Sequence, residues 1–160
     1  MPEISGTTPE RGFPPMSFIE SIRTVLSKYA VFSGRARRSE YWWFALAYTI
    51  VMSILYFALV VPGLTAYTAD LMADPAAQMP GSVMTGYLIV SVVGLALFLP
   101  SLGVLVRRLH DTDRSGFWYF FAFVPVVGPI MLIVWEATEG TQGPNRFGAD
   151  PKAVEQTSAV

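Results

Sequence analysis

Two arginine-rich segments carry most of the side chains in this sequence that could do chemistry. Residues 34–43 read Gly-Arg-Ala-Arg-Arg-Ser-Glu-Tyr-Trp-Trp, and residues 107–118 read Arg-Arg-Leu-His-Asp-Thr-Asp-Arg-Ser-Gly-Phe-Trp. Guanidinium groups bind phosphate through charge-assisted hydrogen bonds, and paired aspartates can hold Mg²⁺ beside a substrate diphosphate. The chemistry that these segments indicate is recognition of anionic, phosphorylated groups.

The candidate binding residues fall into two sets. The arginines expected to bind lipid headgroups or phosphate are Arg35, Arg37, Arg38, Arg107, Arg108 and Arg114. A possible functional cluster beside them comprises His110, Asp111, Asp113, Asn145 and Arg146.

Local structure gives some of these residues simpler roles. Ser39 is expected to cap the following helix, and Glu40 to face the positive end of its dipole. Arg107 and Asp111 are four residues apart and are expected to form an ion pair on one helical face. Under this interpretation the second segment is an ion-paired turn.

No catalytic residue, metal or cofactor is predicted. The chain contains no cysteine, which excludes disulfides and thiolate nucleophiles. His110 is the only histidine; it could act as a general base, but no nucleophile motif accompanies it. Gly140, Gly143 and Gly148 lack the spacing of a dinucleotide-binding loop and are interpreted as turn glycines.

The elements around these segments are membrane helices. Hydrophobic residues make up 52% of the 160 residues and charged residues only 14%, a composition that is not typical of soluble proteins. Uncharged runs cover residues 41–61, 83–106 and 117–135. The first run, as a helix, would be about 31 Å long, close to the hydrocarbon thickness of a bilayer. We predict an all-α integral membrane protein with three transmembrane helices.

The distribution of positive charge predicts the orientation. Six Lys and Arg precede the first span, none lies in residues 62–82, and three lie between the second and third spans. Because positive flanks stay in the cytoplasm, the N-terminus and residues 107–114 are expected there. Asp70 and Asp74 are expected on the opposite side.

The third span has two interpretations. Pro125 and Pro129 remove backbone donors near its middle and flank Gly128. The favoured interpretation is a kinked helix that crosses fully. The alternative is a re-entrant hairpin, which would return the tail to the cytoplasm and place Asn145 and Arg146 beside the Arg107 segment.

The remaining chain is interfacial or irregular. Apolar residues recur at helical spacing between Phe18 and Tyr29, which predicts an amphipathic interfacial helix before the first span. Residues 1–16 are predicted to be a disordered lead, 17–151 the membrane domain and 152–160 a disordered tail.

Small residues repeat every four along two spans and predict close helix packing: Ala45, Thr49 and Ser53, and Gly86, Val90 and Gly94.

Three motifs together resemble a known family. Residues 34–42, 107–116 and 140–148 (Gly-Thr-Gln-Gly-Pro-Asn-Arg-Phe-Gly) resemble, in order, the bacterial inner-membrane family called domain of unknown function 805. The resemblance covers roughly residues 18–151. It implies a bacterial inner-membrane location and no particular activity.

The leading functional hypothesis is a small, non-enzymatic inner-membrane protein, an interaction or accessory subunit whose cytoplasmic arginine rim binds anionic phospholipids. It would form a homo-oligomer or join a larger membrane complex, and no nucleic-acid partner is expected. The alternative is an enzyme or carrier for a phosphorylated lipid, with Arg107, Arg108 and Arg114 binding phosphate, Asp111 and Asp113 binding a metal, and His110 transferring a proton.

Overall fold

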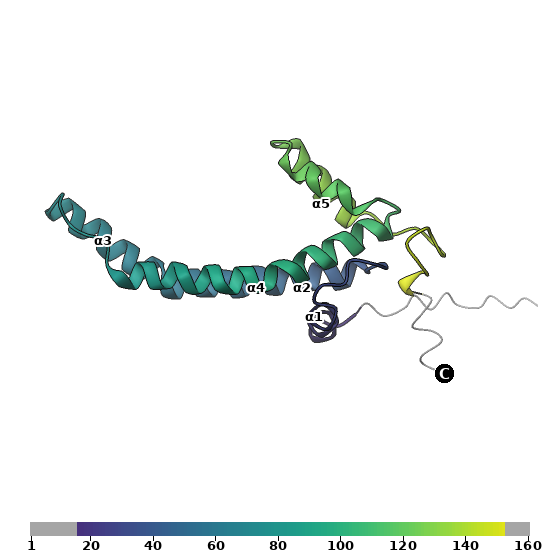
Figure 1. Ribbon diagram of the computed structural model, residues 1–160, viewed down its shortest axis with the longest axis horizontal. Coiled ribbons are helices and arrows are strands. Elements are labelled where there is room, and N and C mark those ends of the chain that lie inside the picture. Colours follow the sequence, from purple (N-terminus) through teal and green to yellow (C-terminus); the bar gives the residue numbers. More distant parts are fainter. Residues whose placement is uncertain (1–15, 153–160) are drawn as a thin grey trace, which may run out of the picture.

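The computed structural model describes residues 16–152, and all its regular elements are helical (Figure 1). The predicted lead 1–16 and tail 152–160 lie outside the described residues apart from Met16 and Lys152. In chain order the elements are α1 (Phe18–Ser27), α2 (Arg38–Leu59), α3 (Val61–Ala73), α4 (Gly81–Asp111), the 3-10 helix η1 (Gly116–Phe123) and α5 (Val127–Ala137).

Two of the three predicted spans form long apolar helices. Within residues 16–152, two helical stretches are long and apolar enough to cross a membrane. The first is residues 38–73, which comprise α2 and α3, and the second is α4. Figure 1 shows α2 and α4 side by side along most of their length. The 31 residues of α4 correspond to about 46 Å, so its last turn extends beyond a hydrocarbon core of about 30 Å. Arg108 lies in that last turn, as the sequence predicts, whereas Arg107 lies one residue before it.

A glycine allows α4 to approach α2 closely. A Cβ atom on Gly86 would lie 2.5 Å from the carbonyl oxygen of Leu59, a distance that no side chain tolerates. This contact confirms the prediction of close helix packing at Gly86. The prediction is less accurate elsewhere, because Gly94 has only an ordinary contact with Met52 and Ala45 borders a cavity.

The third apolar run forms a hairpin instead of the kinked helix that the favoured interpretation predicts over 117–135. After η1 the chain turns at Pro125 and Val126, where Val126 has φ +66°, and α5 returns. The two limbs pack through their aromatic rings, since Trp118 and Trp135 have ring centroids 5.3 Å apart. Pro125 and Pro129 lack the backbone donors that a continuous helix would use here. With 11 residues, α5 is only about 16 Å long and is too short to span a bilayer.

The amphipathic helix α1 begins at a capping box, in which the Ser17 side chain accepts from the Glu20 amide. Val25 packs into a small core with Ala36, Phe44 and Val104, which ties α1 to α2 and α4. Figure 1 views α1 almost end-on while α2 and α4 run across the picture, so α1 lies across the helix pair. Its outer face leaves apolar side chains exposed, among them Ile19 and Leu26.

Candidate functional site

The ends of α2 and α4 meet in a buried group of charged side chains that we call the arginine cluster: Arg35, Glu40, Arg107, Arg108 and Asp111. The three arginine side chains are at most 1% exposed and the two carboxylates at most 7%. Arg35 comes from the segment before α2, Glu40 from the first turn of α2, and the other three from the C-terminal end of α4. Buried charges require partners, and each of these side chains has them.

Asp111 is the centre of the arginine cluster. Its Oδ1 accepts from Nε of Arg35 at 2.9 Å, and its Oδ2 accepts from Nη1 of Arg108. Its carbonyl oxygen accepts from the amide of Thr141 at 2.8 Å. One residue therefore joins the segment before α2, the end of α4 and the C-terminal tail.

The predicted pair of Arg107 and Asp111 is wrong. Nη2 of Arg107 donates to Oε1 of Glu40 at 2.9 Å, and its Nη1 donates to the carbonyl of Val31 at 2.7 Å. A partner on another helix replaces the partner on the same face because α2 packs directly against α4. Glu40 thus links two helices instead of only facing the α2 dipole.

The expected cap of α2 is also wrong. The N-cap residue is Arg37, which makes no side-chain cap bond, and Ser39 lies inside the first turn. The helix begins two residues earlier than expected. This start places Glu40 opposite Arg107 and leaves Ser39 with a carbonyl that accepts from the hydroxyl of Ser21.

The segment that follows α5, residues 138–152, closes over the arginine cluster through main-chain acceptors; we call it the C-terminal tail. Arg35 donates from Nη1 to the carbonyl of Gly143 at 2.6 Å and from Nη2 to that of Thr141 at 2.5 Å. Arg108 donates to the carbonyls of Glu136 and Thr138. Gly140 has no space for a side chain, because a Cβ atom there would overlap the Asp111 carboxylate. This tight approach is a second role for a residue that the sequence indicates only as a turn glycine.

The second candidate set is brought together at the edge of the arginine cluster. The Phe147 ring stacks on the His110 ring with centroids 3.9 Å apart, and Nδ2 of Asn145 donates to the carbonyl of His110 at 2.9 Å. Nδ1 of His110 lies 3.1 Å from the carbonyl of Gly34, which makes Nδ1 the protonated nitrogen. Burial lowers the pKa of His110, outweighing that hydrogen bond, and the nearby Arg146 lowers it further. His110 is thus a neutral packing residue near pH 7.

The two aspartates of the second segment do not converge. Asp111 faces the arginine cluster, whereas Asp113 has φ +56° and pairs at the surface with Arg146 at 3.1 Å. No group of three metal-ligating side chains occurs among residues 16–152.

Other candidate arginines lie around this buried group. Arg38 is 47% exposed and lies 3.4 Å from the Glu139 carboxylate. Arg114 lies over the Trp135 ring at 5.0 Å. Arg37 is buried and donates to the carbonyl of Pro151 at 3.0 Å. Among the candidate arginines, Arg38 and Arg146 are exposed, whereas Arg35, Arg107 and Arg108 are enclosed.

Sequence reasoning missed Glu136, a buried acid at the end of α5 and beyond the apolar run 117–135. It is 1% exposed, and neither carboxyl oxygen has a hydrogen-bond partner in the described part of the chain. Burial raises the pKa of Glu136 to about 8, although the Arg108 guanidinium acts in the opposite direction. The available signal was an acidic residue directly after nineteen uncharged ones.

Comparison with known proteins assigns the sequence that builds this site to a family. A family model described as "Protein of unknown function (DUF805)" matches residues 29–149, which include the whole arginine cluster and most of the tail that covers it. The chain belongs to the DUF805 family. Inner membrane protein YhaI of Escherichia coli K12 is 45% identical over 129 residues, which cover 81% of this chain and 92% of YhaI.

Inner membrane protein YhaH of the same organism is 38% identical over 131 residues, covering 80% of this chain and 93% of YhaH. No solved structure matches the chain. With two long apolar helices and relatives named as inner membrane proteins, this chain is a membrane protein whose family has no established function.

The position of Asp111 leads to a stability prediction. Asp111→Asn leaves two buried guanidinium groups without their carboxylate, and breaking a buried pair in this way costs about 3 to 5 kcal/mol. Asp113→Asn is the matched control, because its exposed pair contributes about 1 kcal/mol or less. Melting temperatures in mild detergent should fall strongly for Asp111→Asn and little for Asp113→Asn. Equal melting temperatures would contradict the central role of Asp111.

Glu136 leads to a pH prediction. Its pKa rises from 4.5 in the unfolded chain to about 8 on folding, so the folded state holds this proton more tightly. That stabilisation is full below about pH 4.5 and is lost as pH rises through about 8. Glu136→Gln should therefore raise the melting temperature relative to wild type at about pH 9 but not at about pH 5.

The control is Glu139→Gln, three residues further on. The pKa of Glu139 is lowered, chiefly by the hydrogen bond from Lys152, so this group stays ionised across that range. Its difference from wild type should not vary with pH between those limits. A pH-independent effect of Glu136→Gln would show that the buried carboxyl is already ionised near pH 5.

Proposed function

We propose that this protein is a small, non-enzymatic, multi-pass protein of the bacterial inner membrane. Its exposed cytoplasmic arginines bind anionic phospholipid headgroups, and it acts as a homo-oligomer or as an accessory subunit of a larger membrane complex. The observation that carries the proposal is the unequal charge at the two ends of the α2–α4 pair. Outside residues 60–81, the described chain holds ten Lys and Arg and seven Asp and Glu, a net charge of +3.

The opposite end supports the same orientation. Residues 60–81 contain Asp70 and Asp74 and no Lys or Arg, a net charge of −2. By the positive-inside rule, the arginine cluster faces the cytoplasm together with the N-terminus, and α3 faces the other compartment. In this orientation α1 lies in the cytoplasmic interface, with the exposed side chains of Ile19 and Leu26 among the acyl chains.

The hairpin of η1 and α5 then enters the membrane and leaves on the same side. Its tip exposes apolar side chains such as Phe123, Val126 and Ile130, which suit a hydrocarbon environment. Its C-terminal end joins the arginine cluster, because the carbonyl of Thr138 accepts from Arg108. Its N-terminal end begins at Gly116, five residues after Asp111. The proposed topology is therefore two crossings and one re-entrant hairpin, with both termini in the cytoplasm.

Headgroup binding is assigned to the arginines that remain accessible. Arg38 and Arg146 are about half exposed, and their pairs with Glu139 and Asp113 are surface contacts of small net strength. Each basic residue at headgroup depth gains about 1 kcal/mol against anionic lipid. Arg114, which lies over the Trp135 ring, stays in the proposal, whereas Arg35, Arg107 and Arg108 are assigned to holding the fold.

The alternative of an enzyme or carrier for a phosphorylated lipid is less well supported. It requires Asp111 and Asp113 at one metal site and His110 free for proton transfer. Asp111 instead binds two arginines, Asp113 faces the surface, and His110 is stacked under Phe147. The geometry therefore favours binding over catalysis.

Reporter fusions test the topology. A reporter that is active only outside the cytoplasm should be inactive when appended to the C-terminus and active when inserted between Asp74 and Pro80. A second reporter that fluoresces only in the cytoplasm should give the opposite pattern. An active external reporter at the C-terminus would mean that residues 116–137 cross the membrane completely.

Thermal stabilisation by lipid tests headgroup binding. In zwitterionic detergent, phosphatidylglycerol should raise the melting temperature more than phosphatidylcholine does, and about 0.5 M salt should reduce this difference by screening. The double variant Arg38→Gln/Arg146→Gln should lose about half of the difference or more, since it removes about 2 kcal/mol of headgroup attraction. The matched control Arg38→Lys/Arg146→Lys keeps the charge and should retain the difference. Equal responses to both lipids in the wild type would contradict the proposal.

A further inference from the structure

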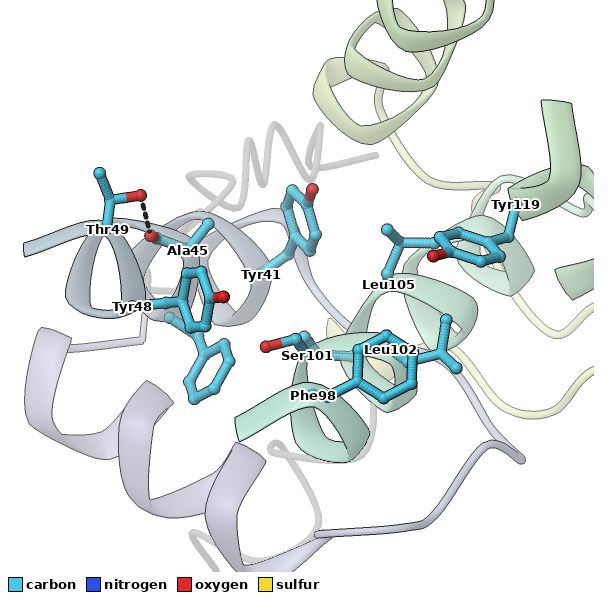
Figure 2. Close-up of a pocket in the computed structure, with 11 residues that line it drawn as sticks. Tyr41, Ala45, Tyr48, Thr49, Phe98, Ser101, Leu102, Leu105 and Tyr119 are labelled. Atoms are coloured by element: carbon cyan, nitrogen blue, oxygen red, sulfur yellow. Dashed lines mark hydrogen bonds between the residues drawn. The ribbon is translucent and has the colours of Figure 1, made fainter. Parts of the chain in front are cut away.

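A cavity of about 280 Å³ lies between α2, α4 and η1 (Figure 2). Its lining comes from one face of residues 41–49 in α2, one face of residues 98–105 in α4, and Tyr119 of η1. Figure 2 shows Phe98 and Leu102 on α4 across the space from Tyr41 and Tyr48 on α2. The volume is close to the lower limit of ligand pockets in proteins.

The cavity lies directly on the membrane side of the arginine cluster. Tyr41 follows Glu40 of that cluster, and Leu105 is two residues from Arg107. From there the walls extend into the apolar runs predicted to span the membrane. The cavity therefore connects the charged end of the molecule with the hydrocarbon region.

The walls are mainly apolar, because six of the eleven lining residues have no polar side-chain atom: Phe44, Ala45, Phe98, Leu102, Val104 and Leu105. The Ser101 hydroxyl donates to the carbonyl of Leu97 at 2.7 Å, and the Thr49 hydroxyl donates to that of Ala45 at 2.9 Å. Both hydroxyls thus use their protons within their own helices. The hydroxyls of Tyr41, Tyr48 and Tyr119 are the other polar side-chain groups of the lining. Because most of the wall is apolar, the cavity favours an apolar chain over water along most of its length.

We propose that this cavity binds one acyl chain of a cytoplasmic-leaflet phospholipid. The inference rests on the proposed membrane orientation and headgroup binding, and it adds the site of the lipid tail. A chain whose headgroup lies near Arg38 enters beside Tyr41 and runs between α2 and α4. The aromatic ring of Tyr119 closes the site on the side of the η1–α5 hairpin. Filling the space restores the packing contacts that an empty cavity forgoes.

This occupant explains two features that close helix packing does not. Ala45 and Thr49 are small residues on the helix face predicted to touch a neighbouring helix, yet they border the cavity. The hairpin also contacts α4 through η1 and so supplies a third wall without filling the space. Both features leave the space between α2, α4 and η1 unfilled.

Photo-crosslinking tests the proposal. The probe is phosphatidylglycerol with a diazirine near the middle of one acyl chain, added to the full-length protein in nanodiscs. After irradiation, peptide mass spectrometry should locate adducts mainly in residues 41–49, 98–105 and the η1 segment. Ala45→Phe fills the cavity and should reduce those adducts at least about fivefold, because overpacking displaces the chain.

Two further variants keep the test decisive. Ala58→Phe adds the same ring to an exposed position of α2 outside the cavity and should leave the adduct pattern unchanged. Leu102→Ala enlarges the cavity and should retain or increase adducts there, which decides the matter if Ala45→Phe does not fold. Adducts spread evenly along α2 and α4, or unaffected by Ala45→Phe, would overturn the proposal.

The readouts separate this inference from headgroup binding. Even adducts combined with a preserved response to phosphatidylglycerol would remove the chain site and leave the headgroup proposal intact. Localised adducts combined with equal thermal responses to phosphatidylglycerol and phosphatidylcholine would support the chain site and contradict the headgroup proposal. A cavity occupied by a second copy of the chain would give no adducts there and disulfide-linked dimers of Ser101→Cys, which also overturns the proposal.

Discussion

The fold depends on the carboxylate of Asp111, which accepts hydrogen bonds from Arg35 and Arg108 at once. Through these two arginines it fixes the chain before α2, the end of α4 and the carbonyls of the tail. Removing water from so many charges is expensive, and the cost is offset only when every charge has a partner. The main-chain carbonyls of Gly143, Thr141 and Thr138 complete this set, which is why the tail must fold back at this point.

This constraint decides what the other arginines can do. Arg35, Arg107 and Arg108 are enclosed because they hold the helix ends together, so recognition is left to side chains at the margin such as Arg38 and Arg146. Glu136 is the exception inside the molecule, a carboxyl without a hydrogen-bond partner in the described chain. It lies beside Arg108, whose guanidinium is already shared between Asp111 and main-chain carbonyls. The arginine cluster therefore holds paired charges and lies beside one carboxyl, that of Glu136, whose charge depends on pH.

The sequence predicted much of the fold from hydrophobic runs and charge. Local patterns predicted the helices α2, α4 and α1, the place of Arg108 in the last turn of α4, and the close approach at Gly86. Failures occurred where partners come from distant segments. Arg107 was assigned to Asp111 by spacing along one helix, but Glu40 lies nearer in space. The run 117–135 was long enough for a span, but two prolines and the packing of Trp118 on Trp135 made a hairpin.

By itself, the sequence determined that this chain enters a membrane, which of its ends carries positive charge, and to which family it is similar, because hydropathy, charge counts and motifs are properties of the linear chain. Only the tertiary structure decided which arginines are buried, that the tail covers them, and that α2, α4 and η1 enclose a cavity. Those features depend on which side chains meet across helices, and many of the contacts join residues more than 65 positions apart. No local pattern encodes such a choice, since several arginines and carboxylates in the same segments could have paired equally well.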